Sequence, residues 1–117
     1  MGRLTTHVLD LVRGMPATGM LIELAAIEGA TRRLVKKATT NRDGRCDQPL
    51  LEGEAFTAGV WQLEFHVAAY FTAQGVTVND PAFLDIVPVR FGVANPAQPY
   101  HVPLLVTPWS YSTYRGS

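Results

Sequence analysis

The stretch YHVPLLVTPWSYSTYRGS (residues 100–117) decides the fold, because it reads as two β-strands around one turn. We expect strands over Tyr100–Val106 and Trp109–Arg115, paired around Thr107-Pro108. The sequence then ends in Tyr114–Ser117, which carries an aromatic hydroxyl, a cation, a glycine and a hydroxyl. Because they follow directly on a β run, residues 100–113, that also holds His101, these groups would line a polar pocket when packed together on a sheet surface. Read alone, the tetrapeptide is equally typical of the polar end of a soluble chain.

Upstream of this stretch, short apolar-rich runs alternate with turn signals, which is typical of an all-β sandwich. In residues 61–67, Trp61, Leu63 and Phe65 alternate with polar residues and predict a half-buried strand. Pro88 lies within another expected strand, which indicates an edge strand or a bulge. We predict one domain over residues 1–117, a two-sheet sandwich of about eight strands. The other expected strands cover Leu4–Val12, Met20–Glu28, Thr31–Thr40, a short edge segment at Glu54–Thr57, and Ile86–Val93.

Turn and helix signals separate these strands. Asn41–Gly44 contains Asp-Gly, which tolerates positive φ, and predicts a tight turn. Ala68–Gln74 has the length and alanine content of two helical turns, and Gly75 is expected to end this one short helix. Arg13–Pro16 is expected to close the first strand.

Two of the expected strands are apolar on both faces. Within residues 100–107, Val102 and Leu104 lie on one face, while Pro103 and Leu105 lie on the other. Within residues 4–12, one face shows Leu4 and Val8 and the other shows Leu9 and Leu11. A sandwich with one wet face per sheet shows polar residues at alternate positions instead. We therefore expect other subunits to cover the outer faces in a symmetric oligomer.

Composition excludes several classes of protein. Ten Lys and Arg residues balance ten Asp and Glu residues, and neither sign forms a block. The densest basic run, residues 32–37, alternates charged pairs with apolar residues, so we interpret it as a solvated strand face rather than a nucleic-acid stripe. Cys46 is the only cysteine, which excludes an internal disulfide and a CxxC motif. We interpret it as a loop residue without a chemical role. The alternative interpretation is a catalytic thiol.

No targeting or membrane signal is evident. No apolar stretch reaches membrane-spanning length, the N-terminus lacks a basic and apolar leader, and the last residues are not a peroxisomal signal. We therefore expect a cytoplasmic protein with neither a membrane nor a nucleic-acid partner.

The three histidines fall into two groups. His66 is in phase with Gln62 and Glu64 on the polar face of its strand, so we interpret it as a solvated surface histidine. His7 and His101 each lie on an otherwise apolar face. A lone histidine so placed is commonly structural, but two of them in the same environment indicate a shared site. An imidazole pair can take and return a proton near neutral pH without a cofactor.

Metal binding is the rival use of these histidines. No HxH, HExxH or CxxC motif occurs, and a zinc site would need a third ligand from elsewhere, such as Asp47. Serine chemistry lacks a GxSxG motif. Arg45 follows the Asp-Gly turn and on local context is solvent-facing. If its loop folds over the pocket, its planar cation suits a urea-like edge and a developing oxyanion.

Together these residues resemble a known family. The stretches LTTHVLD (4–10), VRG (12–14) with PA (16–17), and HVPLL (101–105) through SYSTYRGS (110–117) are similar to those of the transthyretin-like proteins, and within them of the 5-hydroxyisourate hydrolases. The resemblance extends over essentially the whole chain. Hormone-carrying transthyretins share the fold and the SYST run but lack the histidine pair, the turn arginine and the YRGS ending.

The resemblance implies a transthyretin-like sandwich, a homotetramer with active sites where dimers meet, and no metal or organic cofactor. It implies hydrolysis of the small molecule 5-hydroxyisourate at its six-membered ring to 2-oxo-4-hydroxy-4-carboxy-5-ureidoimidazoline, after urate oxidation. The catalytic residues would be His7, Arg45 and His101, and those holding substrate and pocket shape Tyr114, Arg115, Gly116 and Ser117. Which histidine is the base stays open. The alternative is a non-catalytic transthyretin-like carrier or interaction module, since fold alone does not fix function.

Overall fold

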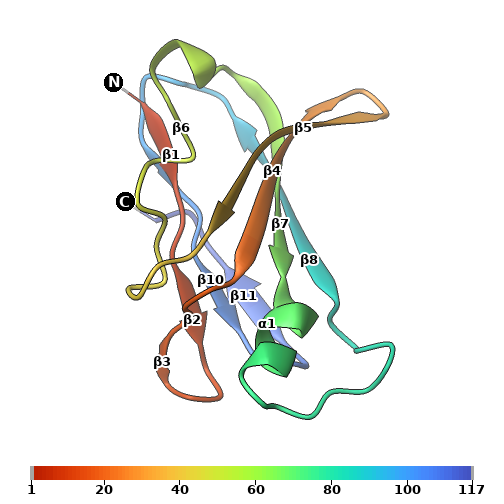
Figure 1. Ribbon diagram of the computed structural model, residues 1–117. Coiled ribbons are helices and arrows are strands. Elements are labelled where there is room, and N and C mark those ends of the chain that lie inside the picture. The colour runs from red at the N-terminus through yellow and green to blue at the C-terminus, as the bar shows by residue number, and fades with distance from the viewer. Residues whose placement is uncertain (1, 117) are drawn as a thin grey trace.

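The computed structural model describes residues 2–116 and contains strands in two facing layers, with one short α-helix at one end (Figure 1). This confirms the predicted all-β sandwich. The first layer holds the strands that carry the histidine pair, and the second holds the long central strands. The positions of the two histidines follow from the pairing within the first layer.

Two distant segments run parallel at the centre of the first layer. Strand β1 (Arg3–Thr5) pairs with β9 (Tyr100–His101), and β2 (Val8–Asp10) pairs with β10 (Leu104–Val106). Backbone bonds from Val102 N to Thr5 O, 2.9 Å, and from Leu104 N to His7 O, 2.9 Å, carry the ladder between them. The chain from residue 3 to 10 therefore lies beside residues 100–106 with the same offset between partners throughout, although the two strand pairs belong to separate sheets.

Short strands flank this parallel pair. β11 (Tyr111–Thr113) pairs antiparallel with β10, which confirms the predicted final strand pair. On the other side, β2 pairs with β3 (Met15–Pro16), and β1 pairs with β6 (Leu51–Glu52). The layer thus brings the N-terminal, C-terminal and 45–52 segments together (Figure 1).

The second layer is one antiparallel sheet in the order β5-β4-β7-β8. Its strands are β5 (Thr31–Thr39), β4 (Leu21–Glu28), β7 (Gly59–His66) and β8 (Ile86–Val93). β8 lies at the edge, so Pro88 removes no inner ladder bond, which confirms the prediction from proline. The basic run lies on β5, the opposite edge strand, where Arg32 and Arg33 are exposed.

The core fills the space between the layers. Leu4, Val8 and Leu104 from the first layer and Leu24, Leu63 and Phe65 from the second are fully buried. Burying each such side chain stabilises the fold by about 1.5–3 kcal/mol. The alternation of side chains along the strands therefore places apolar residues on the inner face of each layer. The outer face of the first layer is left open for the candidate site.

The helix α1 (Val67–Ala73) begins one residue before the predicted helix and ends ahead of Gly75, which has φ 82°. The Tyr70 hydroxyl donates to Asp10 Oδ2 at 2.7 Å. Asp10 is fully buried, and its Oδ1 also accepts from the Val12 and Arg13 amides at 2.9 and 3.1 Å. Burial and the Asp10 carboxylate raise the pKa of Tyr70 to about 12. This bond ties the helix to the end of β2.

Three expectations about local structure were wrong. The predicted edge segment at Glu54–Thr57 is a 3-10 helix over Gly53–Ala55, since backbone turning at Gly53, φ 63°, replaces extension. Met15–Pro16, expected only to close a strand, pairs with Leu9 and Asp10 as β3. The single strands expected over residues 4–12 and 100–106 are each interrupted: the first forms β1 and β2 on either side of residues 6–7, and the second forms β9 and β10 on either side of residues 102–103.

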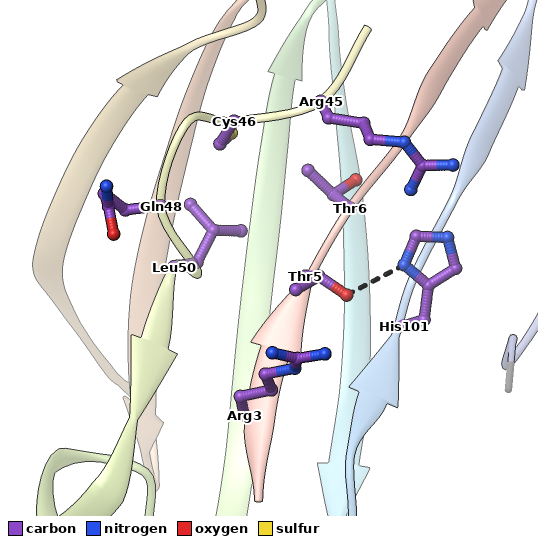
Figure 2. A pocket seen from close by; sticks show the side chains of 8 residues that line it. All are labelled: Arg3, Thr5, Thr6, Arg45, Cys46, Gln48, Leu50 and His101. Atoms are coloured by element: carbon purple, nitrogen blue, oxygen red, sulfur yellow. Dashed lines mark hydrogen bonds between the residues drawn. The ribbon is translucent and has the colours of Figure 1, made fainter. Parts of the chain in front are cut away.

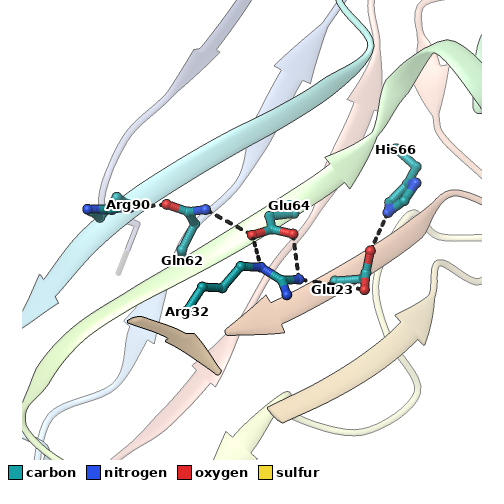
Figure 3. A network of polar contacts seen from close by, with 6 residues as sticks. All are labelled: Glu23, Arg32, Gln62, Glu64, His66 and Arg90. Carbon is teal, nitrogen blue, oxygen red and sulfur yellow. Dashed lines mark hydrogen bonds and ion pairs between the residues drawn. The ribbon is translucent and has the colours of Figure 1, made fainter. Parts of the chain in front are cut away.

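A polar network covers the outer face of the second layer (Figure 3). Arg32 donates twice to Glu64, at 2.7 and 2.8 Å, and this bond lowers the pKa of that carboxyl. His66 Nε2 lies 2.7 Å from Glu23 Oε1, and the His66 side chain is only 21% exposed. His66 shares the polar face as predicted, but it is partly buried and paired with a carboxylate rather than freely solvated.

Candidate active site

His7 and His101 lie on one face of the parallel strand pair. Thr5 is directly opposite His101, and Leu9 is opposite Leu105. Because side chains alternate along a strand, Thr5, His7 and Leu9 project from the face opposite the core. These three side chains and those of His101 and Leu105 are partly exposed, whereas the neighbouring Leu4 and Val8 are fully buried. Strand pairing therefore brings His7 and His101, which are 94 positions apart in the sequence (101 − 7), onto the same face of the layer.

The turn at residues 41–44 delivers Arg45 to this face. The bond from Gly44 N to Asn41 O, 2.9 Å, confirms the predicted turn. Gly44 has φ 76°, and a Cβ there would lie 2.4 Å from the Val8 carbonyl oxygen. Only glycine fits this close approach, which lets Val8 N donate to Gly44 O at 2.8 Å. As a result Arg45 pairs with His7 in an antiparallel bridge.

A cavity of about 420 Å³ opens beside these residues (Figure 2). Figure 2 shows the guanidinium of Arg45 directed toward the His101 ring and that of Arg3 on the opposite side of the Thr5 hydroxyl. Its lining is formed by Arg3, Thr5, Thr6, Arg45, Cys46, Gln48, Leu50 and His101. The cavity therefore presents two cations, an imidazole, an amide and hydroxyls. This lining suits a flat polar or anionic small molecule rather than an apolar one.

The two imidazoles have different partners. His101 Nδ1 lies 2.9 Å from Thr5 Oγ1, and His7 Nε2 lies 2.8 Å from the Asp43 carbonyl oxygen. Burial is the main cause that lowers the pKa of His101 below its ordinary value of 6.5, and the charges of Arg45 and His7 lower it further. His101 is therefore neutral at neutral pH and can accept a proton.

The C-terminal residues divide between the two faces of the sheet. Gly116 pairs with His101, and Gly116 N donates to His101 O at 2.7 Å. Tyr114 is 60% exposed. Arg115 lies on the other face, with its Cζ 3.9 Å from the centre of the Tyr100 ring. The structure thus brings Gly116 to the histidine site but does not bring the Arg115 guanidinium there. Ser117 lies outside the described residues.

Gly116→Ala is expected to lower kcat by about tenfold or more, because small displacements of a reacting group are costly. An added Cβ would lie 2.6 Å from His101 Cδ2, so the imidazole would have to move. Steady-state kinetics at fixed pH measures this effect, and thermal unfolding checks that the fold is intact. Wild-type kcat in a well-folded Gly116→Ala variant would contradict this placement of Gly116.

The remaining candidates have local roles. Cys46 is half-buried at the cavity, and burial raises the pKa of its thiol, which opposes thiolate chemistry. Asp47 Oδ1 accepts from the Asn41 amide at 2.9 Å rather than approaching the histidines. Within residues 2–116, no three His, Cys, Asp or Glu residues gather as a metal site would require. No helix in that range is long and apolar enough to cross a membrane.

Sequence reasoning did not single out Thr5 and Arg3. The signal was available, because period-two alternation places residues 3, 5 and 7 on one strand face. A threonine and an arginine at those positions break an otherwise apolar face in the same way as His7 does.

The structure is a two-layer β-sandwich with a cavity, lined by His101 and Arg45, on the outer face of its parallel strand pair. Comparison with known proteins identifies the class of protein that has this architecture. The chain belongs to the HIUase/Transthyretin family, whose sequence pattern matches residues 4–116.

Individual relatives agree with this membership. The chain is 58% identical to "5-hydroxyisourate hydrolase" of Ralstonia nicotianae over 117 residues, all of both chains. Its fold matches "(S)-allantoin synthase" with a TM-score of 0.93 and 46% identity, covering 99% of this chain and 44% of that one. It also matches sea bream transthyretin in complex with thyroxine, with a TM-score of 0.87 and 28% identity, over 97% and 94% of the two chains.

Proposed function

We propose that this chain hydrolyses 5-hydroxyisourate to 2-oxo-4-hydroxy-4-carboxy-5-ureidoimidazoline, a step of urate breakdown. The observation that supports the proposal is that Arg45 and His101 line one polar cavity within a single chain, while His7 pairs with Arg45 and acts electrostatically on His101. Three segments far apart in sequence supply these groups. The name of the Ralstonia nicotianae relative, identical at 58% of positions, supports the same reaction.

Opening a cyclic amide requires an activated water, a stabilised oxyanion and a proton for the leaving nitrogen. In the proposed reaction an imidazole takes a proton from water, and the oxygen bonds to the ring carbonyl carbon. The ring C–N bond then breaks, and the imidazolium returns that proton to the leaving nitrogen. One water is consumed, and no cofactor is needed for this sequence. A neutral His101 in a partly buried site suits the first step.

Arg45 supports the charge that develops during this step. Its guanidinium presents planar donors to a carbonyl or urea-like edge and keeps its charge at all relevant pH values. Its charge already acts on His101, so a substrate between the two would receive both proton transfer and oxyanion stabilisation.

A direct assay tests the proposed activity. The protein is mixed with urate freshly oxidised by urate oxidase, and the absorbance of 5-hydroxyisourate is followed against a protein-free blank. Enzymatic hydrolysis predicts a loss of absorbance faster than the blank and proportional to protein concentration. An unchanged decay would exclude this function.

A non-catalytic carrier on the same fold is the alternative. The relative bound to thyroxine shows that the family includes ligand-binding proteins. The cavity beside His101 favours the enzyme instead, since Arg3, Arg45 and Gln48 are poor walls for a largely apolar ligand. In the decay assay a carrier would leave the substrate lifetime unchanged or lengthen it.

The pH dependence of kcat/KM should show an acidic limb. The base must be neutral in the free enzyme, so activity is present above its pKa and lost as pH falls through it. Because the pKa of His101 is lowered below 6.5, we expect the midpoint of this limb below pH 6.5. Rates over pH 4.5–8 with stability checked at each pH measure it. A midpoint above pH 6.5 would assign the base elsewhere.

We further propose that the protein forms a homotetramer with the histidine sites at the junction of dimers. Apolar Leu9 and Leu105 lie side by side on the outer face of the first layer. Leu11 and Val12, just beyond β2, are about half exposed, at 50% and 49%. An exposed apolar surface of this kind is typical of a protein–protein interface. Light scattering should give four times the chain mass of 12.8 kDa, and a mass of one chain would contradict it.

A further inference from the structure

The hydrogen-bond partner of His7 fixes the proton on its ring. The Asp43 carbonyl oxygen, 2.8 Å from His7 Nε2, can only accept. A neutral His7 therefore carries its proton on Nε2, and its lone pair is on Nδ1. To shuttle a proton at Nε2, His7 would first have to lose this bond.

The partner of His101 imposes no such restriction. Thr5 Oγ1 lies 2.9 Å from His101 Nδ1, and a hydroxyl can both donate and accept. If Nδ1 is unprotonated, the hydroxyl donates to it; if Nδ1 is protonated, the hydroxyl accepts. The bond therefore persists in both neutral tautomers and in the imidazolium. Figure 2 shows the second ring nitrogen of His101 on the side of the Arg45 guanidinium, away from Thr5.

Thr5 is itself held firmly. It pairs directly with His101 across the parallel strands, and its carbonyl oxygen accepts from Val102 N at 2.9 Å. The β-branched side chain of threonine is stiff about χ1. The hydroxyl is thus fixed by two paired strands rather than by a loop, as a positioning group requires.

We propose that Thr5 is a positioning residue that orients His101 and keeps Nε2 free to exchange the catalytic proton. With Nδ1 protonated, Nδ1–H keeps its hydrogen bond to Thr5 Oγ1 while Nε2 takes a proton from water and while Nε2 returns that proton to the leaving nitrogen. The charged or titratable groups around this ring are Arg3, Arg45, His7 and the thiol of Cys46. A hydroxyl is the one uncharged partner here that serves every protonation state. This inference rests on the proposed hydrolysis.

Thr5→Val removes the hydroxyl while keeping the shape of the side chain. We expect kcat to fall by about 10- to 100-fold, the scale of a misoriented reacting group, with KM changed little. Thr5→Ser restores the hydroxyl and should restore most of kcat. The matched control is Thr113→Val, which removes a hydroxyl bond of 2.7 Å to Pro103 O without touching a histidine. It should keep wild-type kcat.

The pH profile separates positioning from a merely structural role. In the imidazolium, Nδ1–H donates to Thr5, and a bond to a charged donor is the stronger kind. Losing it favours the neutral ring, so the acidic limb of kcat/KM should move to lower pH in Thr5→Val. Thr5→Ser and Thr113→Val should leave the limb in place.

The outcomes are distinct. A wild-type protein that does not accelerate 5-hydroxyisourate decay refutes the hydrolysis itself. An active wild type whose Thr5→Val variant keeps normal kcat and an unmoved acidic limb refutes the role of Thr5. If Thr5→Val does not fold, Thr5→Ala replaces it. Long-range proton–nitrogen NMR of the wild type gives a second check: a protonated His7 Nδ1 with a bare Nε2 would overturn the contrast between the two rings.

Discussion

His101→Ala is expected to lower kcat for 5-hydroxyisourate by about 10²–10⁴-fold, the usual contribution of a positioned acid–base group. His101 lies at the cavity, keeps its Nδ1 on Thr5, and has a lowered pKa that leaves it neutral. The rate should approach that of spontaneous decay. His7→Ala is expected to act in the same direction, since His7 adjoins Arg45 and acts electrostatically on His101.

His66→Ala provides the matched control. His66 is also half-buried and hydrogen-bonded, but it lies on the second layer with Glu23. Loss of that pair should lower the unfolding temperature while leaving kcat unchanged. Near-normal turnover in both His101→Ala and His7→Ala would show that the assignment of catalytic residues is wrong.

Arg45→Met is expected to lower kcat by about 10²–10³-fold, the range found when one oxyanion donor is removed. Methionine keeps an unbranched side chain but removes the charge and the planar donors. Arg45 is exposed and makes no side-chain ion pair within the described residues, so its loss should cost little stability. Single-turnover and steady-state rates together separate this effect from weaker binding.

Two further variants make the Arg45 experiment specific. Arg45→Lys retains the charge without the planar fork and should recover only part of the rate. Arg33→Met removes another exposed arginine, which pairs with Glu28 at 3.2 Å on the second layer, and should leave kcat unchanged. Full activity in Arg45→Met would exclude a role for this cation in the chemical step.

Strands with strict alternation were predictable from sequence almost to the residue. Apolar alternation predicted β7, turn signals delimited β4 and β5, and Pro88 predicted the edge position of β8. Partner choice was not predictable, because the residues of β2 and β10 carry no signal that they pair in parallel across most of the chain. The local conformation at Gly53–Ala55 was not predictable either, since a 3-10 turn replaces the expected extended edge segment there.

The site was predictable in its chemistry more than in its geometry. His7 and His101 stood out because each interrupts an apolar strand face. The Gly44 turn brings Arg45 to the cavity, as the family resemblance implied and local sequence context did not. Arg115 shows the limit: its residue type suited the site, yet the register that pairs Gly116 with His101 turns it toward Tyr100. Alternation from Gly116 would have revealed this once the pairing was known.

The most direct test of the site is a crystal structure of the protein with a non-hydrolysable planar analogue of 5-hydroxyisourate. The account predicts the analogue in the cavity lined by Arg3, Thr5 and Gln48, with His101 Nε2 and the Arg45 guanidinium in hydrogen-bond contact with its carbonyl edge. An analogue bound elsewhere, for example in the opening beside Tyr100 and Arg115, with that cavity filled only by solvent, would contradict it.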